Sequence, residues 1–268
     1  MRALPLVLVV SGGLLAACLD EAPDESTGVY SVESHNRLGA NRLGANRLGA
    51  NRLGANRLGA NGLIALNRES AEELLATDDG REVLSYIVSC ALPDGMVLID
   101  EDPEPGAPSE YFGALGLAPD WLDAPLDSVG KGWVSACLFA RVNANAEAVP
   151  ISLRGRHPEL ATTAQEELDY PVQEGAFYGN YFTPIEVPIA WFSCRGTGQA
   201  AGETGGVADR DCAEPSSDPN VSQCGFTYQG DCFGKHKACA QDRGGVYSHC
   251  DDDESGPAKQ VITTYVAP

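Results

Sequence analysis

Residues 79–93 read D-G-R-E-V-L-S-Y-I-V-S-C-A-L-P, and this stretch decides how the folded part of the chain begins. Its apolar side chains recur every three or four positions, which is the period of one helix face. Asp79 suits a helix N-terminus, and Pro93 ends a helix because it has no backbone N–H to donate. The sequence therefore predicts a helix from Gly80 to Leu92 whose apolar side includes Cys90.

A second amphipathic stretch lies about 45 residues further along the chain. It predicts a helix that begins at Asp127 or Ser128 and ends near Val142. Cys137 falls on the apolar face of this helix, as Cys90 does on the first. Two apolar helix faces that each carry a cysteine favour a disulfide between Cys90 and Cys137.

Short apolar runs between turn residues predict strands. The predicted strands are Met96–Ile99, which is expected to be buried, Val149–Leu153, Ile185–Cys194 with Pro188 marking a sheet edge, and Val261–Val266. Shorter helices are expected after a capping box at Ser70, at Pro119–Leu122, and in part of Tyr170–Phe182. The expected class is α+β: one disulfide-braced globular domain over residues 68–268, with a loop-rich, cysteine-rich region at 194–258.

The composition narrows the possible functions. The chain has 268 residues, of which 43% are hydrophobic and 21% charged, and a disordered chain is less apolar than this. No run reaches the roughly 18 to 20 apolar residues of a membrane span. The net charge of −20 repels phosphate backbones, so nucleic acid is not an expected partner.

The first 17 residues have the layout of an export signal. Arg2 precedes an apolar stretch that is too short to span a membrane and that ends in small residues. The sequence Leu15-Ala16-Ala17-Cys18 resembles the lipobox of bacterial lipoprotein precursors. The resemblance implies cleavage before Cys18, lipidation of its thiol, and attachment to a membrane through that lipid.

Two further observations bear on this anchor. Removing Cys18 from the nine cysteines leaves eight, an even number that can pair completely. Leu19, rather than an aspartate, follows the lipobox cysteine. In the lipoprotein family this implies the outer membrane rather than the inner one, with the folded domain in the periplasm or at the cell surface.

The segment before the domain is of low complexity. Residues 18–35 form an acidic tether, and residues 36–65 contain five identical copies of N-R-L-G-A followed by a sixth, divergent copy. A five-residue period places successive leucines on different sides of a helix and on opposite faces of a strand. In the frame A-N-R-L-G the repeat resembles the pentapeptide-repeat solenoid family, but Arg stands where an inward Leu is needed. The sequence favours a flexible or partly helical spacer.

The folded part resembles an uncharacterised family of cysteine-containing bacterial lipoproteins. The resemblance covers residues 70–268 and rests on G-R-E-V-L-S-Y-I-V-S-C-A-L-P, G-W-V-S-A-C-L-F-A-R-V-N and E-G-A-F-Y-G-N-Y-F. It implies no activity, since none is established for that family.

The cysteines of the domain are expected to form disulfides in an oxidising compartment. The candidates are Cys90, Cys137, Cys194, Cys212, Cys224, Cys232, Cys239 and Cys250, with Cys239–Cys250 favoured as a second pair. No C-x-x-C is present, so a zinc site that also uses His236 and His249 is the less favoured interpretation, and no metal or other cofactor is expected.

The sequence contains only weak indications of a catalytic site. A Cys90–His157 nucleophile has no local support, and Gly196–Gly202 has the wrong last spacing for a dinucleotide loop. Carboxylates cluster at 100–104, 166–174 and 251–254. A carboxylate pair could hydrolyse a glycoside, but solvated acidic surface is the simpler reading.

The strongest candidate for a ligand surface is aromatic. It comprises Phe177, Tyr178, Tyr181, Phe182 and Trp191. If residues 174–182 are helical, these rings pair at a spacing of four and either fill the core or form a platform for sugar rings or an apolar ligand.

Together these features predict a lipid-anchored protein of the cell envelope with a non-enzymatic role in surface interaction or structure. Its expected partners are the membrane and an envelope glycan or protein. A glycan-binding surface module is the first alternative, and a secreted hydrolase that uses a carboxylate pair is the second. No catalytic residue is assigned.

Overall fold

The computed structural model describes residues 37–38, 55, 58–59, 63, 68–144, 149–184, 186, 188–200, 210–234, 238–251, 258 and 260–268. The chain divides into two compact units, Met1–Ser31 and Val32–Pro268, and every described residue belongs to the second. The predicted α+β class with disulfides is confirmed. No helix among the described residues has the length and apolar character needed to cross a membrane.

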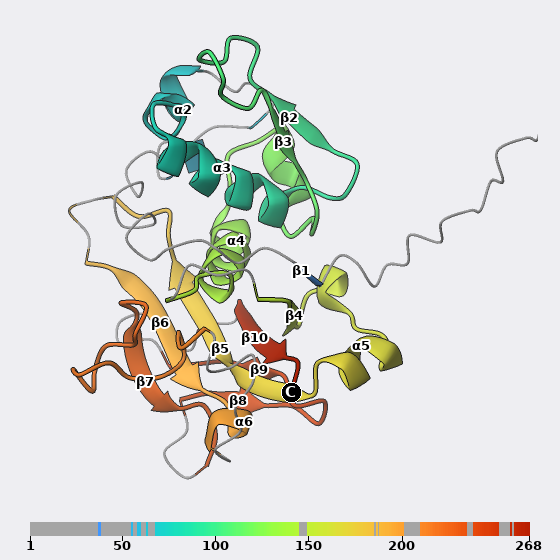
Figure 1. The fold of residues 1–268 in the computed structure, drawn as a ribbon, viewed down its shortest axis with the longest axis vertical. Helices are drawn as coiled ribbons and strands as arrows, with labels where there is room; N and C mark the ends of the chain where they lie inside the picture. Colours follow the sequence, from blue (N-terminus) through green and yellow to red (C-terminus); the bar gives the residue numbers. More distant parts are fainter. Residues whose placement is uncertain are drawn as a thin grey trace, which may run out of the picture. The chain divides into compact units, whose positions relative to one another are not determined.

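Helices and strands are interspersed along the chain (Figure 1). The helices are α2 (Arg68–Leu75), α3 (Asp78–Ala91), η3 (Pro119–Leu122), α4 (Ser128–Ala140), η4 (Pro158–Leu160), α5 (Ala164–Asp169) and α6 (Thr197–Ala200). The strands are β1 (Arg37–Leu38), β2 (Val97–Ile99), β3 (Glu110–Phe112), β4 (Ile151–Gly155), β5 (Val172–Asn180), β6 (Ala190–Arg195), β7 (Thr227–Asp231), β8 (Ala240–Gln241), β9 (Tyr247–Ser248) and β10 (Val261–Val266).

The main sheet has the strand order β1-β4-β10-β5-β6-β7. Its neighbours run antiparallel except β6 and β7, which are parallel. The last strand of the chain, β10, lies between β4 and β5, and all six of its residues are buried. This explains why the closing segment V-I-T-T-Y-V does not alternate between apolar and polar residues: both faces of the sheet are covered here.

The two faces of the sheet belong to different apolar clusters. On one face α4 packs against β5 and β10, and Phe177 joins the large cluster that contains both long helices. On the other face Tyr178 stacks on Phe192 at 5.3 Å, within a smaller cluster built from the cysteine-rich region. Neighbouring residues of β5 therefore face opposite clusters, as the two-residue period of a strand requires.

The two long helices begin at capping residues. Thr77 caps α3, with its hydroxyl accepting from Gly80 N at 3.0 Å, so the predicted cap at Asp79 is wrong by two residues. Asp127 caps α4 through Gly130 N at 2.7 Å, which confirms one of the two predicted starts. These bonds satisfy amides that a helix start leaves without partners.

Three other sequence expectations differ from the structure. Helix α2 begins at Arg68, before the proposed capping box at Ser70. Strand β2 is not buried, because Val97 and Ile99 face outward and only Leu98 faces the core. Strand β6 is internal, since Pro188 precedes it and β7 pairs along its outer side.

All eight cysteines of the domain form disulfides. The pairs are Cys90–Cys137, Cys194–Cys232, Cys212–Cys224 and Cys239–Cys250. The first and the last of these are the two pairings that the sequence favoured. Each closed loop removes conformations from the unfolded chain, which typically stabilises the fold by about 2–4 kcal/mol. Cys18 lies outside the described residues.

The described residues of the repeat contact the folded domain, whereas most of the predicted flexible or partly helical spacer lies outside the described residues. Ala55, Leu58 and Leu63 are buried in the large apolar cluster. The carbonyl of Gly59 accepts from Leu126 N at 3.1 Å, and strand β1, from the first copy, pairs with β4. The five-residue period gave no sign of this, because packing here depends on contacts with the domain rather than on a repeating face.

Candidate functional site

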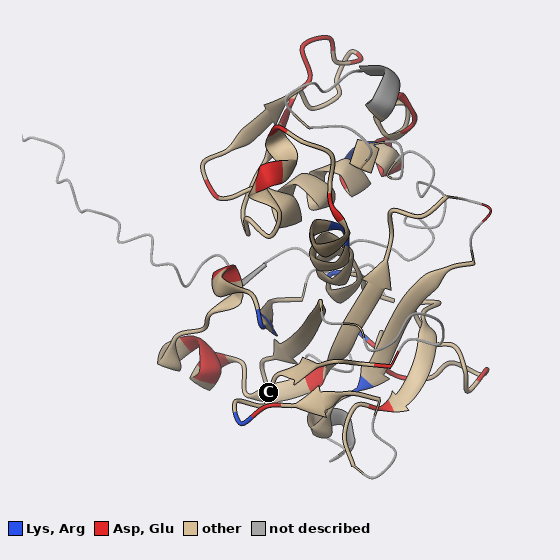
Figure 2. Ribbon diagram, turned by 180° about the vertical axis from the view of Figure 1, so that it is seen from behind, with Lys and Arg blue, Asp and Glu red and all other residues tan. Residues whose placement is uncertain are grey.

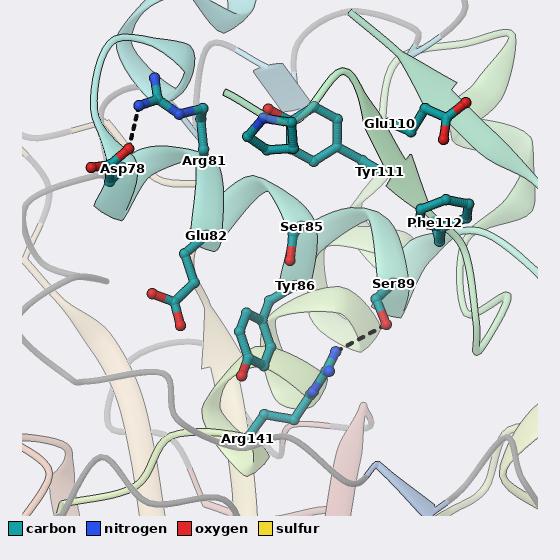
Figure 3. A pocket seen from close by; sticks show the side chains of 11 residues that line it. Asp78, Arg81, Glu82, Ser85, Tyr86, Ser89, Glu110, Tyr111, Phe112 and Arg141 are labelled. Carbon is teal, nitrogen blue, oxygen red and sulfur yellow. Dashed lines mark hydrogen bonds and ion pairs between the residues drawn. The ribbon is translucent and has the colours of Figure 1, made fainter. Parts of the chain in front are cut away.

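A pocket of about 580 Å³ lies where α3, the β2–β3 hairpin and the end of α4 meet (Figure 3). This volume is within the range of small-molecule sites. The lining residues are Asp78, Arg81, Glu82, Ser85, Tyr86, Ser89, Pro108, Glu110, Tyr111, Phe112 and Arg141.

Helix α3 supplies one long wall of the pocket. Its most apolar face, including Val83 and Ile87, is buried in the core, so the neighbouring stripe at Glu82, Ser85 and Ser89 is left to face the pocket. These positions are three or four residues apart and therefore follow one side of the helix. The same periodicity that buries the helix thus aligns its polar groups along the site.

The hairpin supplies the opposite wall. In β3, Tyr111 points inward and is 1% exposed, whereas Phe112 points outward and is 60% exposed. Leu98 pairs with Tyr111 across the hairpin on the inner side, and Val97 pairs with Phe112 on the outer side. One strand therefore presents a buried phenol and an exposed ring to the same pocket.

Arg141 forms the inner end of the site. It is the C-terminal cap of α4, and its side chain is 6% exposed. The guanidinium carbon lies 4.1 Å from the centre of the Tyr86 ring, and Nη1 donates to Ser89 Oγ at 3.2 Å. Cys90 Sγ lies 3.7 Å from the same nitrogen, so the Cys90–Cys137 disulfide backs the site.

This buried cation has no carboxylate partner among the described residues. Its Nε has no hydrogen-bond partner there either. Burial lowers the pKa of Arg141 to about 10, and nearby Tyr86 opposes that shift. The side chain thus remains charged at neutral pH. The ring of Tyr86 and the negative end of α4 offset part of the desolvation cost, but buried charges are ordinarily paired.

A second polar atom at the pocket also has no partner. The hydroxyl of Tyr111 is buried and forms no hydrogen bond among the described residues. Burial raises the pKa of this phenol, and the carboxylate of Asp100 adds to the effect. Tyr111 is therefore a neutral donor at physiological pH. A buried donor without a partner costs about 1–3 kcal/mol, which a bound acceptor would recover.

The rim of the pocket is acidic. Asp78 forms an ion pair with Arg81, and Glu82 and Glu110 also line the opening. Figure 2 shows acidic residues in the loops around this hairpin and on helix α5, in keeping with the net charge of −20. The site therefore combines a single unpaired buried cation with an acidic surround, so it discriminates against ligands of high negative charge.

Cys90, which lies beside Arg141, does not have a free thiol. It is held in a disulfide with Cys137, so the alternative of a Cys90–His157 nucleophile is excluded. His157 instead caps η4, with Nδ1 accepting from Glu159 N at 3.2 Å, and its ring contacts Trp133 at 5.2 Å.

Of the two alternatives for the aromatic residues, core or ligand platform, their burial agrees with the core. Phe177, Tyr178 and Tyr181 are fully buried, and Phe182 and Trp191 are nearly so. The stretch is strand β5 and the turn after it rather than a helix, because β10 and β6 pair along its two sides. Most of these rings contact one another or Phe139 and Phe226, and Tyr178 Oη donates to Asp251 O at 2.8 Å.

The described carboxylates of the three clusters differ in their burial and in their partners. Asp100 is buried and accepts from Asp102 N at 3.2 Å. In the second cluster Glu166 and Glu174 are buried, and Glu174 is ion-paired with Arg210 at 2.9 Å. Of the third cluster only Asp251 is described, and it is exposed.

The remaining predicted sites also have structural roles. Sγ atoms of Cys194, Cys232 and Cys239 lie within 4.8 Å of one another, but all three belong to disulfides. Residues 197–200 of the glycine-rich stretch form helix α6. His249 lies beside Ser248, while His236 lies outside the described residues.

Sequence reasoning missed the pocket and its main residue. Arg141 interrupts the apolar run A-C-L-F-A-R-V at the end of a predicted helix, and that interruption was the available signal. Lys and Arg are common near helix C-termini, so the position alone did not distinguish a buried arginine from a solvated one.

Comparison with known proteins gives no match: no family, no curated protein and no solved structure is similar to this chain.

Proposed function

We propose that this chain is a lipid-anchored protein of the bacterial cell envelope whose domain binds a small carboxylate-bearing ligand without transforming it. The observation that carries the binding role is Arg141, a buried guanidinium that lines a pocket and has no carboxylate partner among the described residues. A ligand carboxylate would complete a charge-assisted hydrogen-bond pair there.

The anchoring part of the proposal rests on the sequence Leu15-Ala16-Ala17-Cys18. Cleavage before Cys18 and acylation would hold the acidic domain at a membrane while leaving its pocket open to solutes. Four disulfides agree with an exported domain, since disulfides persist in oxidising compartments. A glycan or protein partner of the envelope is compatible with the same pocket.

The binding role can be tested with acetate and benzoate on the detergent-solubilised protein at constant ionic strength, with chloride as the reference anion. We expect both carboxylates to raise the melting temperature. Arg141→Met should abolish the increase, because it removes the cation but keeps most of the side-chain volume.

Arg154 provides a matched control. It is also buried and stacks on an aromatic ring, with its guanidinium carbon 3.7 Å from the centre of Tyr265. It does not line the pocket. Arg154→Met should keep the response to carboxylates. An equal response in wild type and Arg141→Met would contradict the proposed site.

The anchor has a separate test. Cys18→Ala should leave the precursor unprocessed or release the protein from the membrane fraction. Normal processing together with retention of the mutant in membranes would show that Cys18 does not carry the anchor.

A further inference from the structure

We infer that the ligand of this pocket is a sugar acid, a monosaccharide unit that carries one carboxylate. This inference rests on the proposed carboxylate-binding function and specifies its ligand class. Three features of the described lining lead to it: the number of cations, the nature of the hydrogen-bonding groups, and the position of one exposed ring.

The charges limit the ligand to a single negative group. Arg141 is the one unpaired cation among the lining residues, because Arg81 is already ion-paired with Asp78. Glu82 and Glu110 would repel a dianion that approached past the rim. A phosphate monoester, which is close to a dianion at neutral pH, is therefore disfavoured, whereas one carboxylate can pair with the guanidinium.

The other polar groups suit hydroxyls. Ser85 and Ser89 project from the same side of α3, and the acidic side chains of Glu82 and Glu110 accept hydrogen bonds. The Tyr111 hydroxyl can donate to a ligand oxygen, since it has no partner among the described residues. A polyhydroxylated ring offers both donors and acceptors to this set, which a simple fatty or aromatic acid does not.

One ring offers an apolar platform. Phe112 lines the pocket (Figure 3) but is 60% exposed. Its strand pairs it with Val97 on the outer side of the hairpin. Ligand pockets are commonly lined by aromatic side chains. The C–H face of a pyranose could cover Phe112 while the sugar carboxylate reaches Arg141.

The test compares D-glucuronate, D-glucose, acetate and inorganic phosphate by calorimetric titration of the detergent-solubilised protein. We expect glucuronate to bind at least tenfold more tightly than any of the other three. Arg141→Met should reduce glucuronate affinity at least tenfold and remove its preference over glucose.

Phe112→Ala separates the sugar from the carboxylate. The substitution should lower the affinity for glucuronate about fivefold or more and leave the affinity for acetate unchanged. Ile99→Ala is the matched control, because Ile99 is 56% exposed on the same hairpin but does not line the pocket. This variant should bind glucuronate and acetate with the affinity of wild type. Its folding shows whether removal of an exposed apolar side chain from the hairpin disturbs the domain.

The outcomes distinguish failure of the sugar-acid inference from failure of the proposed carboxylate-binding function. Acetate binding that depends on Arg141 and equals that of glucuronate would overturn the sugar-acid inference and leave the carboxylate site standing. Phosphate binding more tightly than glucuronate would also overturn the inference. If none of the carboxylates binds in an Arg141-dependent manner, the proposed function fails as well.

Discussion

Arg141 and Arg210 are both buried arginines, but within the described part of the chain only Arg210 has a counter-ion. Arg210 Nε donates to Glu174 Oε1 at 2.9 Å, and Nη2 donates to Ala140 O at 2.6 Å, so this side chain ties β5 to the end of α4. Arg141 has the ring of Tyr86 and the hydroxyl of Ser89 but no carboxylate among the described residues. The first arrangement stabilises the fold, whereas the second leaves a desolvated charge available to a ligand.

The two arginines should therefore differ in their effect on stability. Arg210→Met should lower the free energy of unfolding by about 3–5 kcal/mol, because Glu174 is left buried and unpaired. Arg141→Met should leave it unchanged or raise it, since methionine removes an uncompensated charge. Urea denaturation of both variants provides the measurement. A loss at Arg141 as large as that at Arg210 would show that Arg141 serves the fold rather than a ligand.

His157 should make stability depend on pH. Burial lowers its pKa, and Glu159 opposes this shift. The unfolded chain, with a pKa near 6.5, then takes up the proton before the folded one does. The contribution of neutral His157 is complete above about pH 6.5 and is lost as the pH falls through that value toward the folded pKa.

The variant His157→Asn isolates this contribution, because asparagine can still cap η4 but does not titrate. We expect the melting temperature of wild type to fall more steeply than that of the variant between pH 7 and pH 5. Parallel curves over this range would exclude His157 as the responsible group.

At the level of elements, the structure assigns the repeat a part in the fold. Leu58 is 1% exposed in the main cluster, and a Cβ added to Gly59 would approach Phe182 Cδ1 to 2.8 Å. Leu58 and Gly59 of the fifth copy therefore pack tightly against the turn after β5.

Leu58→Ala should lower the free energy of unfolding by about 2–5 kcal/mol, as burial of a leucine predicts. Deletion of Asn36–Ala60 should cost at least as much, because it removes Ala55 and Gly59 as well. Leu168→Ala, at a position that is 73% exposed, controls for the chemical change. A melting temperature within about 2 °C of wild type after the deletion would restore the spacer interpretation.

The sequence predicted best those elements whose first and last residues are marked by neighbouring residues in the chain. Helices α3 and α4 and strand β10 lie between capping or breaking residues and carry a clear pattern of burial. Strand β5 was mistaken for a partial helix because Phe177 and Tyr181, four residues apart, imitate a helix face. Its conformation is decided by β10 and β6, so tertiary pairing overrides the local pattern.

The pocket could not be predicted for a related reason. Arg141, Tyr86 and Phe112 come from three separate elements, and nothing in their spacing along the chain brings them together. That Arg141 lacks a carboxylate partner is a property of the assembled site. The sequence was more informative about the cysteines. Their even number predicted complete pairing, and the two helix faces that each carry a cysteine favoured Cys90–Cys137.

At the scale of the whole domain, the central place of β10 makes the fold dependent on the end of the chain. β10 joins β4 to β5 in the middle of the sheet, and Ile262 and Val266 belong to the main cluster. Without this strand, β4 and β5 each lose a partner and both apolar clusters are opened. The sheet therefore cannot be completed until residues 261–266 are present.

Deletion of residues 261–268 should abolish cooperative thermal unfolding and leave thiols that react with an alkylating agent without prior reduction. Deletion of 267–268 alone is the matched control. These two residues are exposed, so the melting temperature should change by less than about 2 °C and all eight domain cysteines should stay protected until reduced. Cooperative unfolding in the longer deletion would mean that β4 and β5 find another way to close the sheet, and the central role of β10 would have to be abandoned.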